Sequence, residues 1–388
     1  MAAVTVALIS TYWRTQVRFS LGSTWLAWCT PAPRTPRLGS FAAPVDSPMP
    51  LRSSSLTPIL VACCLGFLVV QLDVSVVNVG LGALKEAFGT DLTGLQWVIN
   101  SYALIFSALL MLGGACGDKW GAKSTFTAGF ATFTLGSIGC GLSDSMTMLV
   151  AMRMLQGVGA AFLVPTSLTL IRLSFANPDH RRSAVALWGA CGGIALAAGP
   201  VIGGLLIDFL GWRSVFLINV PIGILAIVLI SRYAPASPRM DKSVDAGGQV
   251  SIAISLAALT YALTESSGQG WTALTLSSLV GAAFFLLVFV LVERHVKAPM
   301  LPAHLAKNKV LVSMSLAGAV INLTFYGTVF VFSIYFQTIL HYDAFKTGLS
   351  FVPLTAVLTL STLISSRIAR TISARRIIIT GFIIQVIG

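Results

Sequence analysis

Long apolar stretches fill most of the chain, and short polar segments separate them. A helix crosses a hydrocarbon layer of about 30 Å with about 20 mostly apolar residues. In lipid, such a helix satisfies its own backbone hydrogen bonds. The pattern therefore predicts an all-α integral membrane protein with ten complete spans, at residues 58–80, 95–115, 124–142, 147–171, 184–207, 213–231, 248–264, 273–292, 311–336 and 348–366.

An eleventh apolar run begins at Ile377 and stops at Gly388. At 1.5 Å per residue, these residues make about 18 Å of helix, which is too short to cross the hydrocarbon layer. We therefore expect the chain to be truncated at its C-terminus, either as a partial sequence or as a shortened product.

The composition agrees with a membrane protein and argues against a soluble enzyme. Apolar residues make up 56% of the chain and charged residues 10%, whereas about a quarter of the residues of a soluble domain are charged. The four histidines lie in predicted loops, and the six cysteines form no Cys-x-x-Cys pair. We predict no enzymatic activity, no metal site and no cofactor.

The net charge of +12 is distributed by loop rather than gathered on one face. With the N-terminus in the cytoplasm, the loops on the cytoplasmic side carry sixteen Lys and Arg residues and the opposite loops carry three. Such a bias orients multi-pass proteins in membranes. It predicts a multi-pass protein of the cell membrane with a cytoplasmic N-terminus, and it argues against nucleic-acid binding.

The first 55 residues differ from the rest of the chain, because they are rich in Arg, Ser, Thr and Pro and contain no run long enough to span. One interpretation is a transit peptide. The other, which we favour, is a start assigned too early, with the true chain beginning at Met49.

Two charged residues interrupt the predicted spans, and a charge within a membrane is costly and usually functional. Asp73 and Arg153 each lie about 10 Å from the outer end of their predicted spans, so the two side chains are at equal depth and are expected to pair. Such a carboxylate is able to take up and release a proton. The alternative is a static ion pair that only fixes helix packing.

Polar and aromatic residues near this pair favour the functional interpretation. We expect them to line a substrate cavity together with aromatic side chains from other spans, Trp188 among them. The candidate cavity residues are Asn78, Trp97, Asn100, Tyr102, Gln156 and Tyr326.

Two glycine-rich motifs are candidates for gating and conformational change. The first is a tight loop between the second and third spans, where glycines permit the turn and charges hold it in the cytoplasm. The second is a Gly-Pro segment in the fifth span, where glycines four apart permit close helix approach and the proline permits bending. The residues are Gly114, Asp118, Lys119, Gly121 and Lys123 in the loop, and Gly199, Pro200, Gly203 and Gly204 in the span.

Taken in order, these segments resemble the major facilitator superfamily, and within it the fourteen-helix drug:proton antiporters of the EmrB/QacA type, over residues 56–388. The similar segments are Leu72–Val79, Gly114–Lys123, Arg153–Ala161, Gly199–Gly204 and Gly211–Arg213. Ser75 stands where the family has Thr, and Ala122 replaces a usual basic residue.

The resemblance implies a six-helix bundle at 56–232, a linker with two helices at 233–310 and a partial second bundle at 311–388. It also implies that the two bundles rock about a central cavity, with alternating access. It implies proton coupling at Asp73 and Arg153, and export through the motif at Gly199–Gly204. The expected function is proton-coupled export of small amphipathic molecules or drugs. The expected partners are the substrate, protons and the lipid bilayer; a periplasmic adaptor stays unknown. Two alternatives stay open, an importer or facilitator of the same fold and a truncated, transport-inactive remnant.

Overall fold

The structure is a computed structural model that describes residues 53–237, 239, 245–296, 307–357, 360–361 and 374–387. Every regular element within these ranges is a helix. Eight helices there are long and apolar enough to cross a membrane. The predicted extension before residue 53 and the alternative start Met49 lie outside the described residues.

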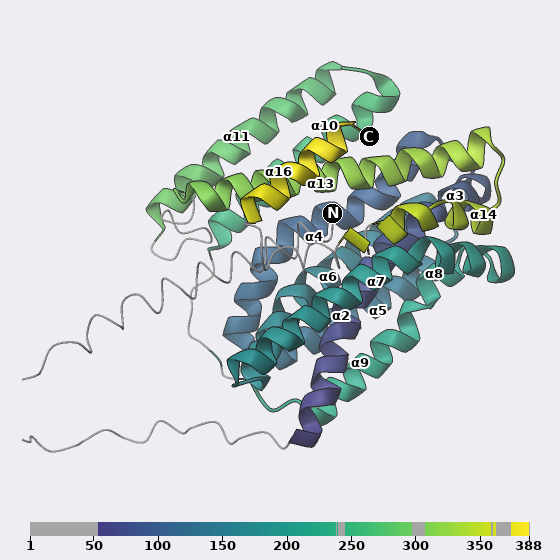
Figure 1. Ribbon diagram of the computed structural model, residues 1–388. Coiled ribbons are helices and arrows are strands. Elements are labelled where there is room, and N and C mark those ends of the chain that lie inside the picture. The colour runs from purple at the N-terminus through teal and green to yellow at the C-terminus, as the bar shows by residue number, and fades with distance from the viewer. Residues whose placement is uncertain are drawn as a thin grey trace, which may run out of the picture.

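Most helices follow the predicted spans closely (Figure 1). In the first bundle they are α2 (Ser53–Val79), α3 (Leu81–Phe88), α4 (Leu92–Trp120), α5 (Ala122–Gly141), α6 (Met146–Ser174), α7 (Pro178–Leu210), α8 (Ser214–Leu217) and α9 (Asn219–Tyr233). The later ones are α10 (Ala246–Gln269), α11 (Ala273–His295), α13 (Lys309–Ile334), the π-helical turn η1 (Tyr335–Ile339), α14 (Ala344–Ser350) and α16 (Ala374–Ile387).

Some predicted spans differ from the helices observed. The span predicted at 213–231 is broken at Ile218 into α8 and α9. The helix α5 occupies the third predicted span but is not one of the eight strongly apolar helices. The tenth predicted span is described only in part, because residues 358–359 and 362–373 lie outside the described ranges. The total of ten complete spans therefore stays a prediction.

Short polar side chains in the loops define where several helices begin. Asp91 accepts a hydrogen bond from the Gly94 N–H at the start of α4, and Ser145 accepts one from Met148 at the start of α6. Asn177 does the same for α7, directly before Pro178. Such caps satisfy backbone N–H groups that have no partner within the helix, so helix boundaries are encoded locally.

The first bundle is held together by close backbone crossings at glycines. An added Cβ at Gly159 of α6 would lie 2.5 Å from the Phe133 backbone nitrogen of α5, and one at Gly157 would lie 2.7 Å from the Tyr102 carbonyl oxygen of α4. Small residues at such crossings let membrane helices approach closely. The aromatic rings of α5 fill the adjoining core, where Phe126, Phe130 and Phe133 are fully buried.

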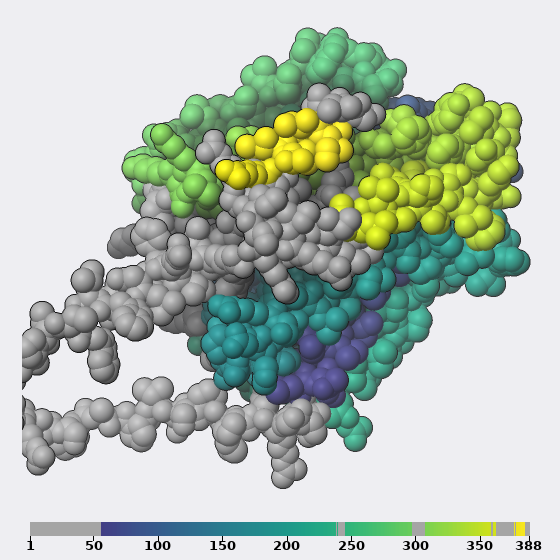
Figure 2. All heavy atoms as spheres, viewed as in Figure 1, coloured from purple at the N-terminus to yellow at the C-terminus, as the bar shows by residue number. Residues whose placement is uncertain are grey.

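The later helices lie against one side of this bundle. The helices α10 and α11 form a hairpin, and α10 packs along α4. The space-filling view shows α11 at the surface of the molecule (Figure 2), and only 11% of the residues in the most apolar part of this helix are buried. The short α14 packs on α7, near α3 and α8 at one end of the molecule (Figure 1). This end is called the α3 end below.

Candidate functional site

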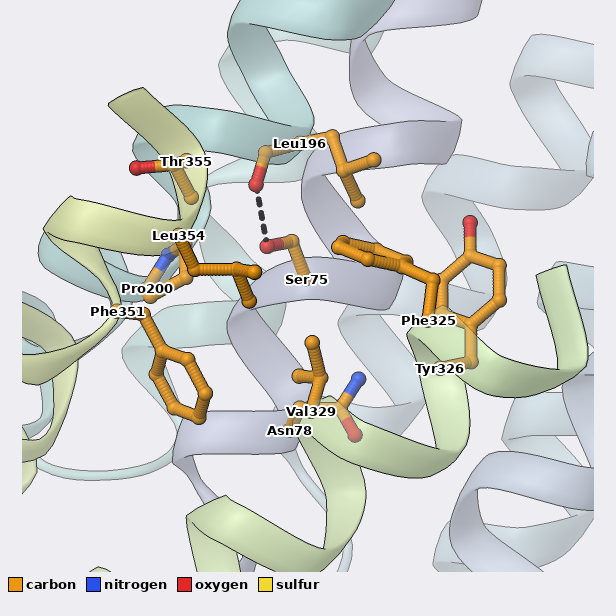
Figure 3. A pocket seen from close by; sticks show the side chains of 10 residues that line it. All are labelled: Ser75, Asn78, Leu196, Pro200, Phe325, Tyr326, Val329, Phe351, Leu354 and Thr355. Atoms are coloured by element: carbon orange, nitrogen blue, oxygen red, sulfur yellow. Dashed lines mark hydrogen bonds between the residues drawn. The ribbon is translucent and has the colours of Figure 1, made fainter. Parts of the chain in front are cut away.

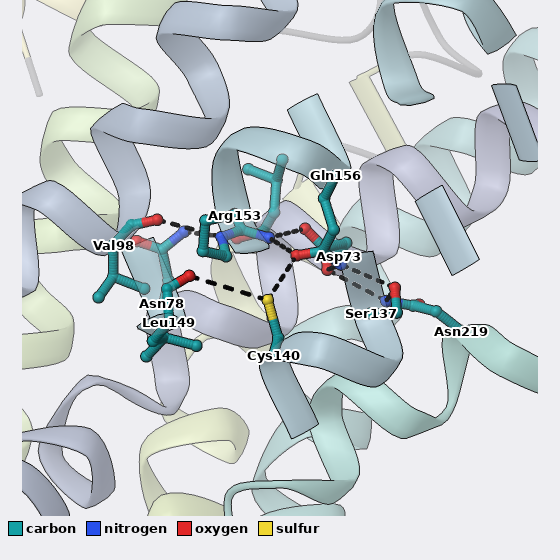
Figure 4. Close-up of polar contacts among 10 residues, drawn as sticks. Asp73, Asn78, Val98, Ser137, Cys140, Leu149, Arg153, Gln156 and Asn219 are labelled. Carbon is teal, nitrogen blue, oxygen red and sulfur yellow. Dashed lines mark hydrogen bonds and ion pairs between the residues drawn. The ribbon is translucent and has the colours of Figure 1, made fainter. Parts of the chain in front are cut away.

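A buried ion pair lies at the centre of the first bundle, between α2 and α6 (Figure 4). The Arg153 Nη1 atom is 2.5 Å from the Asp73 Oδ2 atom, and the two side chains are 1% and 0% exposed. The predicted pairing of these residues is confirmed. Its role in proton transfer stays a prediction.

The second carboxylate oxygen of Asp73 accepts two further hydrogen bonds. The amide nitrogens of Gln156 on α6 and Asn219 on α9 each lie 3.1 Å from Asp73 Oδ1. The same two amide groups donate to the Ser137 hydroxyl of α5, at 2.8 Å from Gln156 and 3.4 Å from Asn219. A buried carboxylate is stable only when its oxygens are paired in this way.

Arg153 is held just as fully. Its Nη1 atom also donates to Gln156 Oε1 at 2.9 Å, and its Nε atom donates to the Val98 carbonyl of α4 at 3.1 Å. The guanidinium carbon lies 4.4 Å from the centre of the Tyr102 ring, which adds a cation–π contact. The network therefore joins α2, α4, α5, α6 and α9, so a change at Asp73 affects side-chain contacts of all five helices.

Two members of this network were not among the predicted site residues. Asn219 is a lone amide in an otherwise apolar stretch of α9, and that isolation is the signal that could have identified it. Ser137 gave no such signal, because small hydroxyl residues are common in membrane helices and often bond only to their own backbone.

A cavity of about 450 Å³ adjoins the ion pair. Arg153 and Tyr102 border it, whereas Asp73 does not. The walls come from α2, α4, α6, α10 and α13, and they combine apolar side chains with amides and hydroxyls. The polar lining residues are Gln71, Asn78, Gln96, Asn100, Tyr102, Arg153, Thr264 and Tyr326.

The structure places four of the six candidate cavity residues on these walls, namely Asn78, Asn100, Tyr102 and Tyr326. Gln156 instead belongs to the Asp73 network and is fully buried. The Trp97 side chain is not among the lining residues, because its indole N–H donates to Glu265 of α10 at 2.8 Å.

Trp188 is not a lining residue either. Its ring stacks on Phe67 with 4.0 Å between centroids, and its N–H donates to the Ser167 hydroxyl at 3.0 Å. Sequence patterns identified these aromatic side chains but gave no information on the direction in which each one points.

The Gly-Pro motif of α7 lies at the contact between three helices. An added Cβ at Gly199 would meet the Ser75 side chain of α2 at 2.4 Å, and one at Gly203 would meet Val76 at 3.0 Å. On the other side, a Cβ at Gly204 would meet the Ala344 carbonyl oxygen at 2.6 Å. Among the described residues, nothing lies within 4 Å of a Cβ added at Gly189 or Gly193 of the same helix, whereas Gly199 and Gly203 make close helix contacts.

Pro200 lacks an N–H, so the carbonyl four residues earlier, that of Leu196, has no partner in its own helix. The Ser75 hydroxyl of α2 donates to this carbonyl at 2.9 Å (Figure 3). Pro200 and Ser75 both lie beside a second, small cavity, which Phe325 and Phe351 border from the later helices. The motif is therefore tied to α2 by a hydrogen bond that the proline itself makes available.

Side chains from α13 and η1 bind the break between α2 and α3. Gln337 accepts a hydrogen bond from the Gly82 N–H at 2.7 Å and donates to the Val79 carbonyl at 2.9 Å. Ser333 donates to the Asn78 carbonyl at 2.5 Å. These contacts, called the Gln337 clasp below, join the first bundle to the later helices at the α3 end.

The loop motif between α4 and α5 is organised differently from the Gly-Pro motif. Gly121 adopts φ +92°, which favours glycine, and permits the turn. The Lys123 ammonium donates to the carbonyls of Ser231 and Ala234 at 3.0 and 2.5 Å, where α9 ends. A cation there stabilises the negative end of a helix. Gly114, Asp118 and Lys119 lie in the last two turns of α4.

Residues 63–388 match the model of the Major Facilitator Superfamily. The chain belongs to this superfamily. It is a multi-pass membrane transporter rather than an enzyme, in agreement with the sequence-based expectation. The superfamily assignment rests on the sequence match and accords with the all-helical architecture described above.

This major facilitator chain is similar to several curated resistance and export proteins. It is 34% identical to the methylenomycin A resistance protein of Bacillus subtilis, over 86% of this chain and 72% of that protein. It is 35% identical to the cephamycin export protein CmcT of Amycolatopsis lactamdurans, over 87% of this chain and 70% of that protein. For the multidrug resistance protein Stp of Mycobacterium tuberculosis the identity is 33%, over 85% of this chain but 62% of that protein.

Solved structures of the superfamily share the fold at low sequence identity. A peptide transporter POT in complex with sulfate gives a TM-score of 0.57 at 13% identity, over 82% of this chain and 68% of that one. The xylose transporter XylE from E. coli, in a partially occluded inward open conformation, gives 0.53 at 13% identity, over 82% of this chain and 74% of that one.

Proposed function

We propose that the chain forms part of a proton-coupled exporter of small amphipathic molecules, of the fourteen-helix antiporter type. The names of its relatives, which include resistance and export proteins, support export. The excess of basic residues in alternate loops supports a cytoplasmic N-terminus, which places the α3 end on the outer side of the membrane.

The observation that carries this proposal is the buried Asp73–Arg153 pair beside the cavity. A proton on Asp73 neutralises the carboxylate that faces Arg153. Removing one charge of a buried pair leaves the other uncompensated, which costs several kcal/mol. Protonation therefore favours a rearrangement in which Arg153 finds another partner, and Arg153 is the member of the pair that reaches the substrate cavity.

The remaining candidate residues receive roles from their positions. Asn78, Asn100, Tyr102 and Tyr326 contact substrate from the cavity walls, while Gln156 positions Asp73.

The motif at Gly199, Pro200, Gly203 and Gly204 closes the α3 end by packing on α2 and α14. The loop with Gly114, Asp118, Lys119, Gly121 and Lys123 acts as a gate at the opposite end. The proposed domains are those that the family resemblance implies: the first bundle at residues 56–232, the linker at 233–310 and the partial second bundle at 311–388.

The test is export driven by an imposed pH gradient in proteoliposomes, with Asp73→Asn as the variant. The amide keeps the size and most hydrogen bonds of the carboxylate but takes up no proton. We expect export in this variant to fall to the level of empty liposomes. The matched control is Asp144→Asn, because Asp144 is an exposed carboxylate paired with Arg213 at 3.2 Å.

Normal gradient-driven export by Asp73→Asn would refute proton coupling at this residue. Accumulation of substrate with the gradient, in wild-type protein, would instead identify an importer. Equal insertion and folding of the two variants, measured by size-exclusion chromatography, ensures that a loss of export reports on the mechanism.

A further inference from the structure

The helix α10, which the sequence assigns to the linker between the bundles, is bound to α4 along its length. Polar side chains that hydrogen-bond across membrane helices hold the helices together, and several along one pair fix the register of the two helices. The contacts are Gln249 to the Ala108 carbonyl, Asn100 to Thr264 at 2.8 Å, Trp97 to Glu265 at 2.8 Å, and Ser267 to Gln96 at 2.8 Å.

The same helix forms part of the wall of the large cavity. Leu263 and Thr264 of α10 line it beside Gln96 and Asn100 of α4. Thr264 is 3% exposed and Asn100 is partly buried, so most of the surface of this polar pair is covered by the surrounding helices. A linker helix in this position contributes directly to the surface that a substrate contacts.

The hydrogen bonds already made at this wall determine which donors and acceptors remain for a ligand. The Asn100 amide N–H₂ donates to the Thr264 oxygen, which leaves the Thr264 proton and the Asn100 carbonyl oxygen for a ligand. Gln96 accepts from Ser267 through its oxygen, which leaves its amide protons. The wall therefore presents both donors and acceptors, and all of them are uncharged.

The charge of the cavity is also balanced. Arg153 is the charged side chain among the described lining residues, and its guanidinium is already paired with Asp73. While Asp73 is ionised, an ionic ligand entering here would lose its hydration without a free charge to replace it. An uncharged ligand with an amide or hydroxyl group loses less, because the wall replaces its hydrogen bonds.

We infer that the Asn100–Thr264 pair is a specificity subsite on the linker helix, which selects uncharged amphipathic molecules that carry an amide or hydroxyl group. This inference deepens the proposed function and rests on it for the identity of the cavity as the transport site. Thr264 is thereby a substrate contact rather than only a residue that packs α10 against α4.

The test measures equilibrium binding of two radiolabelled probes to the purified full chain in lipid nanodiscs. Chloramphenicol is uncharged and carries an amide and hydroxyl groups, whereas ethidium is a permanent cation. We expect the wild-type chain to bind chloramphenicol more tightly than ethidium. Thr264→Val keeps the shape of the side chain and removes its hydroxyl, and should weaken chloramphenicol binding by about fivefold, the value of one hydrogen bond.

Two further variants separate a substrate contact from a packing role. Thr264→Ser keeps the hydroxyl and should bind chloramphenicol as the wild type does. Thr260→Val makes the same change one turn earlier on α10, at a residue that is not among the described lining residues, and should alter neither affinity. Thr264→Val also removes the acceptor of the Asn100 amide, so its melting temperature should fall slightly, whereas Thr264→Ser and Thr260→Val should melt as the wild type does. Unchanged ethidium binding by Thr264→Val shows that the cavity is intact.

Unchanged chloramphenicol binding by Thr264→Val, absent chloramphenicol binding by the wild type, or tighter binding of ethidium would each overturn the inference. Gradient-driven export of chloramphenicol is measured separately in proteoliposomes. Selective binding without any export refutes the proposed function but leaves the subsite in place, whereas export that is indifferent to Thr264→Val refutes the subsite alone.

Discussion

The contact between α7 and α14 predicts that one methyl group at Gly204 opens the α3 end. A Cβ at this position would lie 2.6 Å from both the Ala344 carbonyl oxygen and the Phe345 Cα atom. Both are backbone atoms, so no side-chain rotation relieves the overlap. An ordinary contact begins at 3.4 Å, so Gly204→Ala requires α14 to move away from α7 by about 0.8 Å.

That displacement also breaks a hydrogen bond. The Phe345 N–H donates to the Asp208 carboxylate of α7 at 2.9 Å, and a separation of about 3.7 Å is too long for a hydrogen bond. Overpacking of a close contact costs about 1–3 kcal/mol. Because the open arrangement does not suffer this penalty, the equilibrium between closed and open α3 ends shifts toward open by about 5-fold to 150-fold.

Pulsed electron paramagnetic resonance measures this shift directly. Spin labels at Leu92 of α4 and Leu349 of α14, both exposed, report the distance across the α3 end in a chain whose six cysteines have been replaced. Gly204→Ala should add a population at longer distance. Gly189→Ala is the matched control, since a Cβ added there on the same helix has no described atom within 4 Å.

Identical distance distributions in Gly204→Ala and in the parent would refute this reasoning. So would an equal shift in Gly189→Ala, because that would attribute the effect to α7 in general rather than to its contact with α14.

Two further predictions concern the hydrogen bonds near this end. Ser75→Ala should lower the stability of the solubilised protein by about 1 kcal/mol, because the Leu196 carbonyl loses its donor. The loss of stability caused by Ser75→Ala should be smaller in a Pro200→Ala background, where residue 200 regains an N–H that bonds to Leu196 within α7. Thermal melting of the wild type, the two single variants and the double variant measures this difference, and additive effects of the two substitutions would contradict the prediction. Gln337→Leu removes both hydrogen bonds of the clasp to Gly82 and Val79, and should lengthen the same spin-label distance. A parental distance in that variant would show that the clasp does not hold the α3 end closed.

The sequence predicted the helices of the first bundle because long apolar runs and charged loops are encoded locally. It also indicated the ion pair, since a charge is costly in a membrane and pairing of Asp73 with Arg153 at equal depth lowers the cost of burying each. The pairing needed no knowledge of neighbouring helices, only of depth along each one.

The rest of the site depends on rotation of the helices about their axes, which apolar runs do not encode. Hydrophobicity is nearly uniform around these helices, so the pattern left open whether Trp97 faces the cavity or α10. The same limit applies to Ser137 and to the Gln337 clasp, whose partners lie far away in sequence. The position of α10 beside α4 likewise follows from side-chain pairing, not from composition.

The glycine crossings of the first bundle have a consequence for the evolution of this chain. Where backbones touch, as at Gly157 and Gly159, any added side chain overlaps the backbone of the neighbouring helix, so substitutions there are costly. The cavity wall formed by α10 contacts α4 mainly through side chains instead, and a side chain can be replaced without an overlap between the two backbones. If Thr264 contacts substrate as we infer, substitutions at Thr264 and its neighbours would change the substrate range and leave the glycine contacts of the first bundle unaltered.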